Sequence, residues 1–142
     1  MVQAVHGGRA MNQQAEVLKE RTRKFALDVI ALARSLIRNA EGDTIRRQLV
    51  RAATGVAANY RSTCRARSHD EFVARIGIVL EEADEAELWL GIIEQAQLSD
   101  SPQLARLCDE SRQLRAIFSQ SARTAQSRSK KRRPESDSPS NP

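Results

Sequence analysis

Few side chains in this sequence have the spacing that catalysis or metal binding requires. The only histidines are His6 and His69, and neither stands in an H-x-x-x-H or E-x-x-H pattern. Cys64 and Cys108 form no C-x-x-C pair, so we expect both to be buried thiols in a reducing compartment. The sequence contains no glycine-rich phosphate loop and no nucleophile elbow. It therefore predicts a protein that is not an enzyme, with no metal, no other cofactor and no small-molecule substrate.

The densest acidic cluster comprises Glu81, Glu82, Asp84 and Glu85. Glu81 and Glu85 are four residues apart, so on a helix they share one face. A di-metal carboxylate bundle would need matching E-x-x-H elements on other helices, and the sequence has none. We interpret the cluster as an acidic patch that faces either solvent or an interface.

A basic ridge is predicted from Arg47, Arg51, Arg61 and Arg65, whose spacing places them along one side of a helix. Three interpretations remain open. The ridge could be an ordinary solvated face, whose ion pairs are worth about 0–1 kcal/mol each. It could face the acidic patch of another subunit, or it could be a strip that binds phosphates.

A second basic segment lies near the end of the sequence, in Lys130, Lys131, Arg132 and Arg133. Residues 128–142 hold five basic and two acidic side chains, which gives +3 of the total charge of +5. Short basic runs in disordered tails bind polyanions weakly, and they also serve simply as solubilising ends. The charge of the chain is therefore concentrated locally, and any binding of nucleic acid must rest on the ridge or on the tail.

The elements that must position these side chains are four amphipathic helices. Apolar residues repeat at helical spacing from Leu18 to Leu36, over 44–67, from Phe72 to Ile93 and from Leu104 to Phe118. Boundary signals separate the helices: Gly42 with Asp43, a capping box at Ser68 with Glu71, and Ser101 before Pro102. Gly55, inside the second helix, indicates close contact with a neighbouring helix. We predict an all-α, antiparallel up-down-up-down four-helix bundle over 14–127, a flexible lead-in over 1–13 and a disordered basic tail over 128–142.

The third predicted helix has more apolar surface than one buried face needs. Ile78, Leu88, Trp89 and Ile92 lie away from the seam that runs from Phe72 to Ile93. With Glu81 and Glu85 they form a candidate subunit interface; shielding by a neighbouring helix of the same chain is the alternative. No stretch is long and apolar enough for a membrane span or has the apolar core of a signal peptide, which favours a cytoplasmic protein that contacts no membrane.

A further pattern lies in the second and third predicted helices and is formed by Arg51, Ala52, Ala53, Ala57, Asn59, Glu71, Phe72, Gly77 and Glu85. In these residues the sequence resembles a known bacterial family, the four-helix-bundle proteins first noticed in intervening sequences of 23S ribosomal RNA genes. The accessory variability protein of diversity-generating retroelements is a relative of that family. The resemblance covers residues 18–120, and where many members continue Asn-Ile-Ala-Glu-Gly this chain reads Asn59-Tyr60-Arg61-Ser62.

The resemblance implies a homopentameric ring of bundles. For the retroelement relative it also implies binding of nucleic acid and of a reverse transcriptase through basic surface. We therefore expect a non-enzymatic oligomeric adaptor that binds RNA, DNA or an RNA-handling protein. The alternative is a protein–protein assembly or scaffold factor with no role in nucleic-acid binding.

Overall fold

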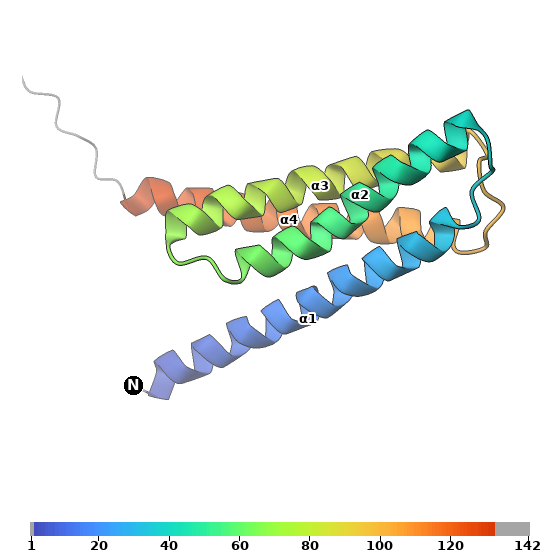
Figure 1. The fold of residues 1–142 in the computed structure, drawn as a ribbon. Helices are drawn as coiled ribbons and strands as arrows, with labels where there is room; N and C mark the ends of the chain where they lie inside the picture. Colours follow the sequence, from blue (N-terminus) through green and yellow to red (C-terminus); the bar gives the residue numbers. More distant parts are fainter. Residues whose placement is uncertain (1, 133–142) are drawn as a thin grey trace, which may run out of the picture.

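The structure, a computed structural model, describes the backbone of residues 2–132 and the side chains of residues 13–132. Four helices follow one another: α1 (Val2–Ala33), α2 (Ala40–Thr63), α3 (His69–Gln95) and α4 (Leu104–Arg132). Short connections reverse the chain three times, so neighbouring helices run antiparallel (Figure 1). The predicted all-α, up-down-up-down four-helix bundle is confirmed.

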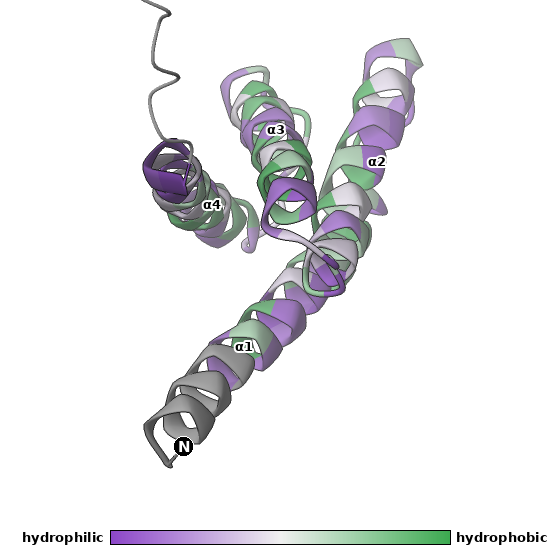
Figure 2. Cartoon of the chain, turned by 90° about the vertical axis from the view of Figure 1, so that its left-hand side faces the viewer, coloured by the Kyte–Doolittle hydropathy of each residue, from purple (hydrophilic) through white to green (hydrophobic). Residues whose placement is uncertain are grey.

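The helices do not contact one another equally. α3 lies between α2 and α4 and packs extensively on both, whereas α1 packs mainly on α2 and touches α4 over a short stretch (Figure 2). In the described part of the chain, the backbones of the diagonal pairs, α1 with α3 and α2 with α4, do not approach each other closely, and α2 meets α4 through side chains in the core. The side of the bundle between α1 and α4 is therefore its least covered side.

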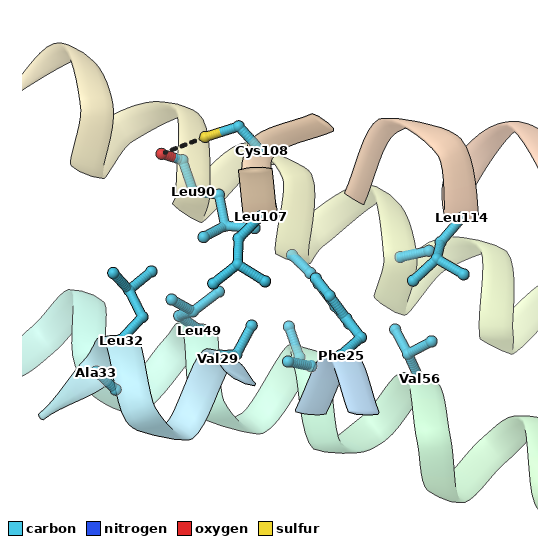
Figure 3. Packing of buried hydrophobic residues seen from close by; sticks show 14 of the residues in the cluster. Phe25, Val29, Leu32, Ala33, Leu49, Val56, Leu90, Leu107, Cys108 and Leu114 are labelled. Carbon is cyan, nitrogen blue, oxygen red and sulfur yellow. Dashed lines mark hydrogen bonds between the residues drawn. The ribbon is translucent and has the colours of Figure 1, made fainter. Parts of the chain in front are cut away.

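The apolar seams of all four helices meet in one core (Figure 3). The aromatic rings of Tyr60 and Phe118 pack against each other with centroids 5.3 Å apart and planes tilted by 46°. Full burial of one large apolar side chain contributes about 1.5–3 kcal/mol to folding. Each helix supplies such side chains, among them Phe25 and Val29, Leu49 and Val56, Val79 and Leu90, and Leu107, Leu114 and Phe118.

The two cysteines have different environments. Cys108 is buried as predicted, its Sγ lies 3.7 Å from the Leu90 carbonyl oxygen (Figure 3), and burial raises its pKa to about 11. Cys64 is exposed, so the expectation that it is buried was wrong. The reason is that α2 ends at Thr63, which takes the buried position, and Cys64 lies at the C-cap on the surface.

The connection between α1 and α2 differs from the predicted one. α1 ends at Ala33, and Asn39 rather than Asp43 caps α2, with its side chain accepting a hydrogen bond of 2.8 Å from the Gly42 amide. Gly42 therefore lies in the first turn of α2 and not beyond the end of α1. Leu36 remains buried in the connection, and the Ile37 amide donates to the Leu98 carbonyl at 3.1 Å.

Gly42→Ala should lower the free energy of unfolding by about 1–3 kcal/mol, the usual cost of overpacking. A Cβ at this position would overlap the carbonyl oxygen of Ile37, a backbone atom that cannot move without disturbing the connection. Thermal unfolding followed by circular dichroism measures the effect. Thr44→Ala, on the exposed surface two residues later, is the control and should change stability little. Equal stability of the two variants would contradict the tight packing at Gly42.

The ends of the other helices agree with the sequence in part. Ser68 caps α3 as predicted: its Oγ accepts from the Glu71 amide at 3.1 Å, and the Glu71 carboxylate accepts from the Arg67 amide at 3.1 Å.

Two predicted boundaries were wrong. α1 begins at Val2, although we expected a loose lead-in over 1–13; no proline interrupts this segment, and Gly7 and Gly8 do not end the helix. α4 continues to Arg132, beyond the predicted end at 127, since 104–132 contain neither glycine nor proline. Basic side chains in its last turn also stabilise this end of the helix, because they interact favourably with the negative end of the helix dipole. The remainder of the predicted tail, 133–142 with Arg133, lies outside the described residues.

Candidate functional site

The outer face of α3 carries apolar side chains exposed to solvent. Ile78 is 45% exposed and Leu88 54% exposed. Ile92 is half-buried on the same side of the helix, and the exposed carboxylates Glu81 and Asp84 lie between these apolar residues. We call Ile78, Glu81, Asp84, Leu88 and Ile92 the α3 outer face. Of the residues predicted for a subunit interface, it brings together Ile78, Leu88, Ile92 and Glu81.

Trp89 and Glu85 lie elsewhere, between α3 and α2. Trp89 is half-buried and packs against the core, and its indole N–H donates to Glu85 at 3.2 Å. The Glu85 carboxylate also accepts a hydrogen bond from the guanidinium of Arg51 on α2. These residues of the candidate interface and of the basic ridge are thus partners within one bundle.

Glu82 occupies the tightest point of the same contact. Its Oε2 atom is buried without a hydrogen-bond partner and lies 3.8 Å from the Arg51 guanidinium. A Cβ at Gly55 would come within 3.0 Å of the Glu82 carboxylate, which accounts for the glycine inside α2. Burial raises the pKa of Glu82 above its ordinary value of 4.5, although the charge of Arg51 acts in the opposite direction.

The free energy of unfolding of Glu82→Gln, measured relative to that of the wild type, should increase as the pH rises. The folded chain holds the Glu82 proton more tightly than the unfolded chain does, so the wild type loses stability as the pH increases above 4.5. Glutamine carries no titrating proton and removes this loss. Urea unfolding of both proteins between about pH 4 and pH 7 measures the difference. Asp109→Asn, which removes an exposed carboxylate of α4, is the control for charge alone; an identical pH profile for both variants would contradict the burial of Glu82.

The basic ridge predicted on α2 is exposed but divided. Arg47, Arg51, Arg61 and Arg65 all reach the surface. Arg51 is paired with Glu82 and Glu85, whereas the other three pair with no described carboxylate. Arg47 lies 14 residues before Arg61, which is about 21 Å along the helix axis. The four arginines therefore do not form one continuous strip.

A different set of basic residues converges at one end of the bundle. α2 ends, α3 begins and α4 ends at this pole of the molecule (Figures 1 and 2). The ring of His69, in the first turn of α3, lies 2.9 Å from the Ala125 carbonyl of α4. Arg132 lines a surface hollow together with Ser68, His69, Asp70 and Ser129. We call this group the basic end; it consists of Arg65, Arg67, Arg128, Lys130, Lys131 and Arg132.

The basic end joins residues that the sequence pattern had kept apart. Arg65 was assigned to the ridge, and Lys130, Lys131 and Arg132 to a separate tail. Arg65 and Arg67 line one surface hollow, together with Ser62 and the paired side chains of Glu71 and Arg75. Arg67 and Arg128 were missed as site residues, because their proximity to the rest depends on α4 remaining helical to Arg132.

Metal binding and membrane crossing would each need a specific feature in the described residues. No three or more His, Cys, Asp and Glu side chains in that part of the chain are grouped so as to hold a metal ion. None of the described helix segments combines the length and the apolar character that crossing a membrane requires.

The sequence and the fold were compared with those of known proteins to identify the family of this chain. No curated protein matches the chain. A solved structure from Bacteroides thetaiotaomicron, described as a protein with unknown function from the S23 ribosomal protein family, superposes with a TM-score of 0.68. It is 23% identical, and the match covers 77% of this chain and 97% of that one. Residues 14–120, well over half of the chain, match the family described as 23S rRNA-intervening sequence protein. The chain therefore belongs to the 23S rRNA-intervening sequence protein family.

Proposed function

We propose that this chain is a non-enzymatic cytoplasmic adaptor that forms a closed homo-oligomer and binds RNA or DNA through the basic ends of its subunits. Five subunits is the number that the family resemblance implies. An RNA-handling protein such as a reverse transcriptase is the kind of protein partner that the same resemblance suggests.

The observation that carries the nucleic-acid proposal is that six basic side chains, from α4 and from the α2–α3 connection, lie at one pole. All six pair with no described carboxylate, so their charges are free to neutralise phosphates. The rings of Phe25, Tyr60 and Phe118 are buried, and those of Phe72 and Trp89 are half-buried. With no exposed ring on which bases could stack, binding should depend little on base sequence.

Assembly is supported by the α3 outer face. Ile78 and Leu88 would lose their exposure to water in a subunit contact, which is the usual driving force for association. A closed ring would carry several basic ends, so contacts that are weak individually could act together on one nucleic acid.

A second candidate function, a purely protein–protein scaffold, is favoured by the same α3 outer face. Its carboxylates Glu81 and Asp84 would repel phosphates while its apolar side chains suit a protein contact. The two functions differ in what the basic end does, because a scaffold would leave it in solvent.

Fluorescence anisotropy of labelled single-stranded RNA and duplex DNA, titrated with the intact chain at several salt concentrations, tests the proposal. We expect similar affinities for unrelated sequences and a steep fall in affinity with salt. Each neutralised phosphate should contribute about 0.7–0.9 to the slope of log affinity against log salt. Absence of binding at low salt would contradict the nucleic-acid function and leave the scaffold function.

A further inference from the structure

A groove between α1 and α2 runs along the surface opposite the core. Its volume is about 590 Å³. The apolar part of its lining includes Ala26, Leu27 and Ile30 of α1 together with Ala57 and Ala58 of α2. Leu27 is 59% exposed, although it is a large apolar side chain. The groove thus has the shape and lining that an apolar helix face would fill.

Unpaired positive charges border this groove. Arg23 of α1, Arg61 of α2 and Arg65, just after the end of α2, line it, and none of them pairs with a described carboxylate. Lys19 also lines the groove, but it is paired with Glu16 at 2.6 Å. Glu20 is the remaining carboxylate of the lining. An occupant should therefore present carboxylates beside its apolar side chains.

The α3 outer face has this combination of side chains. Glu81 and Asp84 pair with no described cation, and they lie between Ile78 and Leu88. Two glycines inside the helix, Gly77 and Gly91, have no heavy atom near the position that a Cβ would take.

These two glycines have no packing role inside the bundle. Each costs about 1 kcal/mol relative to alanine in a helix, and the described contacts within the subunit give no reason for that cost. Small residues on both surfaces, Gly77 and Gly91 on one and Ala57 and Ala58 on the other, would allow two helices to approach closely.

We infer that the α1–α2 groove of one subunit receives the α3 outer face of a second copy. This inference rests on the assembly in the proposed function and names the two surfaces that meet. The surfaces lie on different helices, so the contact is heterologous, and repetition of it produces a ring when the rotation closes. Apolar side chains exposed on both surfaces become buried together, and the unpaired Arg23 and Arg61 come to face unpaired carboxylates.

Charge reversal tests this pairing of surfaces. The groove variant Arg23→Glu/Arg61→Glu and the face variant Glu81→Arg/Asp84→Arg should each be monomeric in light scattering, because each then opposes like charges. An equimolar mixture should form assemblies that contain both chains, since each groove now matches the face of the other variant. In a closed ring of five subunits, one contact between like chains would remain. Circular dichroism checks that both variants fold.

A matched pair of apolar substitutions tests the groove without a change of charge. Leu27→Ser should shift assembly to a concentration at least tenfold higher, because this side chain would be buried by the second copy. Val17→Ser is the control: Val17 is 64% exposed on the same helix but does not line the groove, so its assembly should match the wild type.

The outcomes separate this inference from the function on which it rests. A monomeric wild type would contradict the proposed assembly itself. An oligomeric wild type whose groove variant assembles normally would overturn only the inference, as would a mixture that stays monomeric. A groove variant that keeps its subunit number but loses RNA binding would make the groove a nucleic-acid surface, which also overturns it.

Discussion

Ile78→Asp is expected to convert the oligomer into monomers while helix content stays the same. In the isolated bundle this side chain is 45% exposed, so aspartate can remain hydrated there. In an assembly that covers the α3 outer face, the carboxylate would replace a buried apolar side chain beside Glu81 and Asp84. Removal of an anchor at the centre of an interface commonly costs about 2 kcal/mol or more, and the buried charge adds to this cost.

Light scattering and circular dichroism on the same samples measure the two parts of this prediction. Ile37→Asp is the matched control, because Ile37 is 47% exposed but lies in the connection between α1 and α2. It should leave the subunit number unchanged. If Ile78→Asp loses helix content while it remains oligomeric, Ile78 supports the bundle and not the assembly.

Replacement of three arginines at the basic end should weaken RNA binding by about two orders of magnitude. The variant is Arg67→Gln/Arg128→Gln/Arg132→Gln. Each lost phosphate contact is worth about 1 kcal/mol at an exposed site, and about 1.4 kcal/mol corresponds to a tenfold change in affinity. The slope of affinity against salt should also fall, because fewer phosphates are neutralised.

The matched control removes three positive charges elsewhere. Arg34→Gln/Arg38→Gln/Arg47→Gln changes exposed arginines towards the opposite end of the bundle, and these pair with no described carboxylate. The control should lose only the small, general effect of lower net charge. Equal losses in both variants would mean that RNA responds to total charge and that the basic end is not a site.

The sequence was sufficient to predict features that depend on one helix at a time. The apolar repeat identified the core positions, as for Val56 and Leu90, because a buried stripe must follow the period of its own helix. The Ser68 cap was predicted for a similar reason, since its hydrogen bond reaches only three residues along the chain.

Features that depend on a second helix could not be predicted in this way. Arg51 has the same helical spacing as Arg47, yet α3 brings Glu82 and Glu85 to Arg51 alone. Trp89 lies off the seam of α3, but it packs against the core and bonds to Glu85. The grouping of Arg67 with Arg132 required the end of α4 to be known.

Sedimentation velocity of the intact chain with a fluorescently labelled RNA tests the central claim most directly, because it reports assembly and binding together. At about 50 mM salt we expect the RNA to sediment with a particle several times the 15.8 kDa mass of one chain. At about 200 mM salt the RNA should be released while the protein particle persists, since counterions weaken the phosphate contacts more than the apolar ones. A monomer at both salt concentrations, or an oligomer that never carries the RNA, would contradict the account.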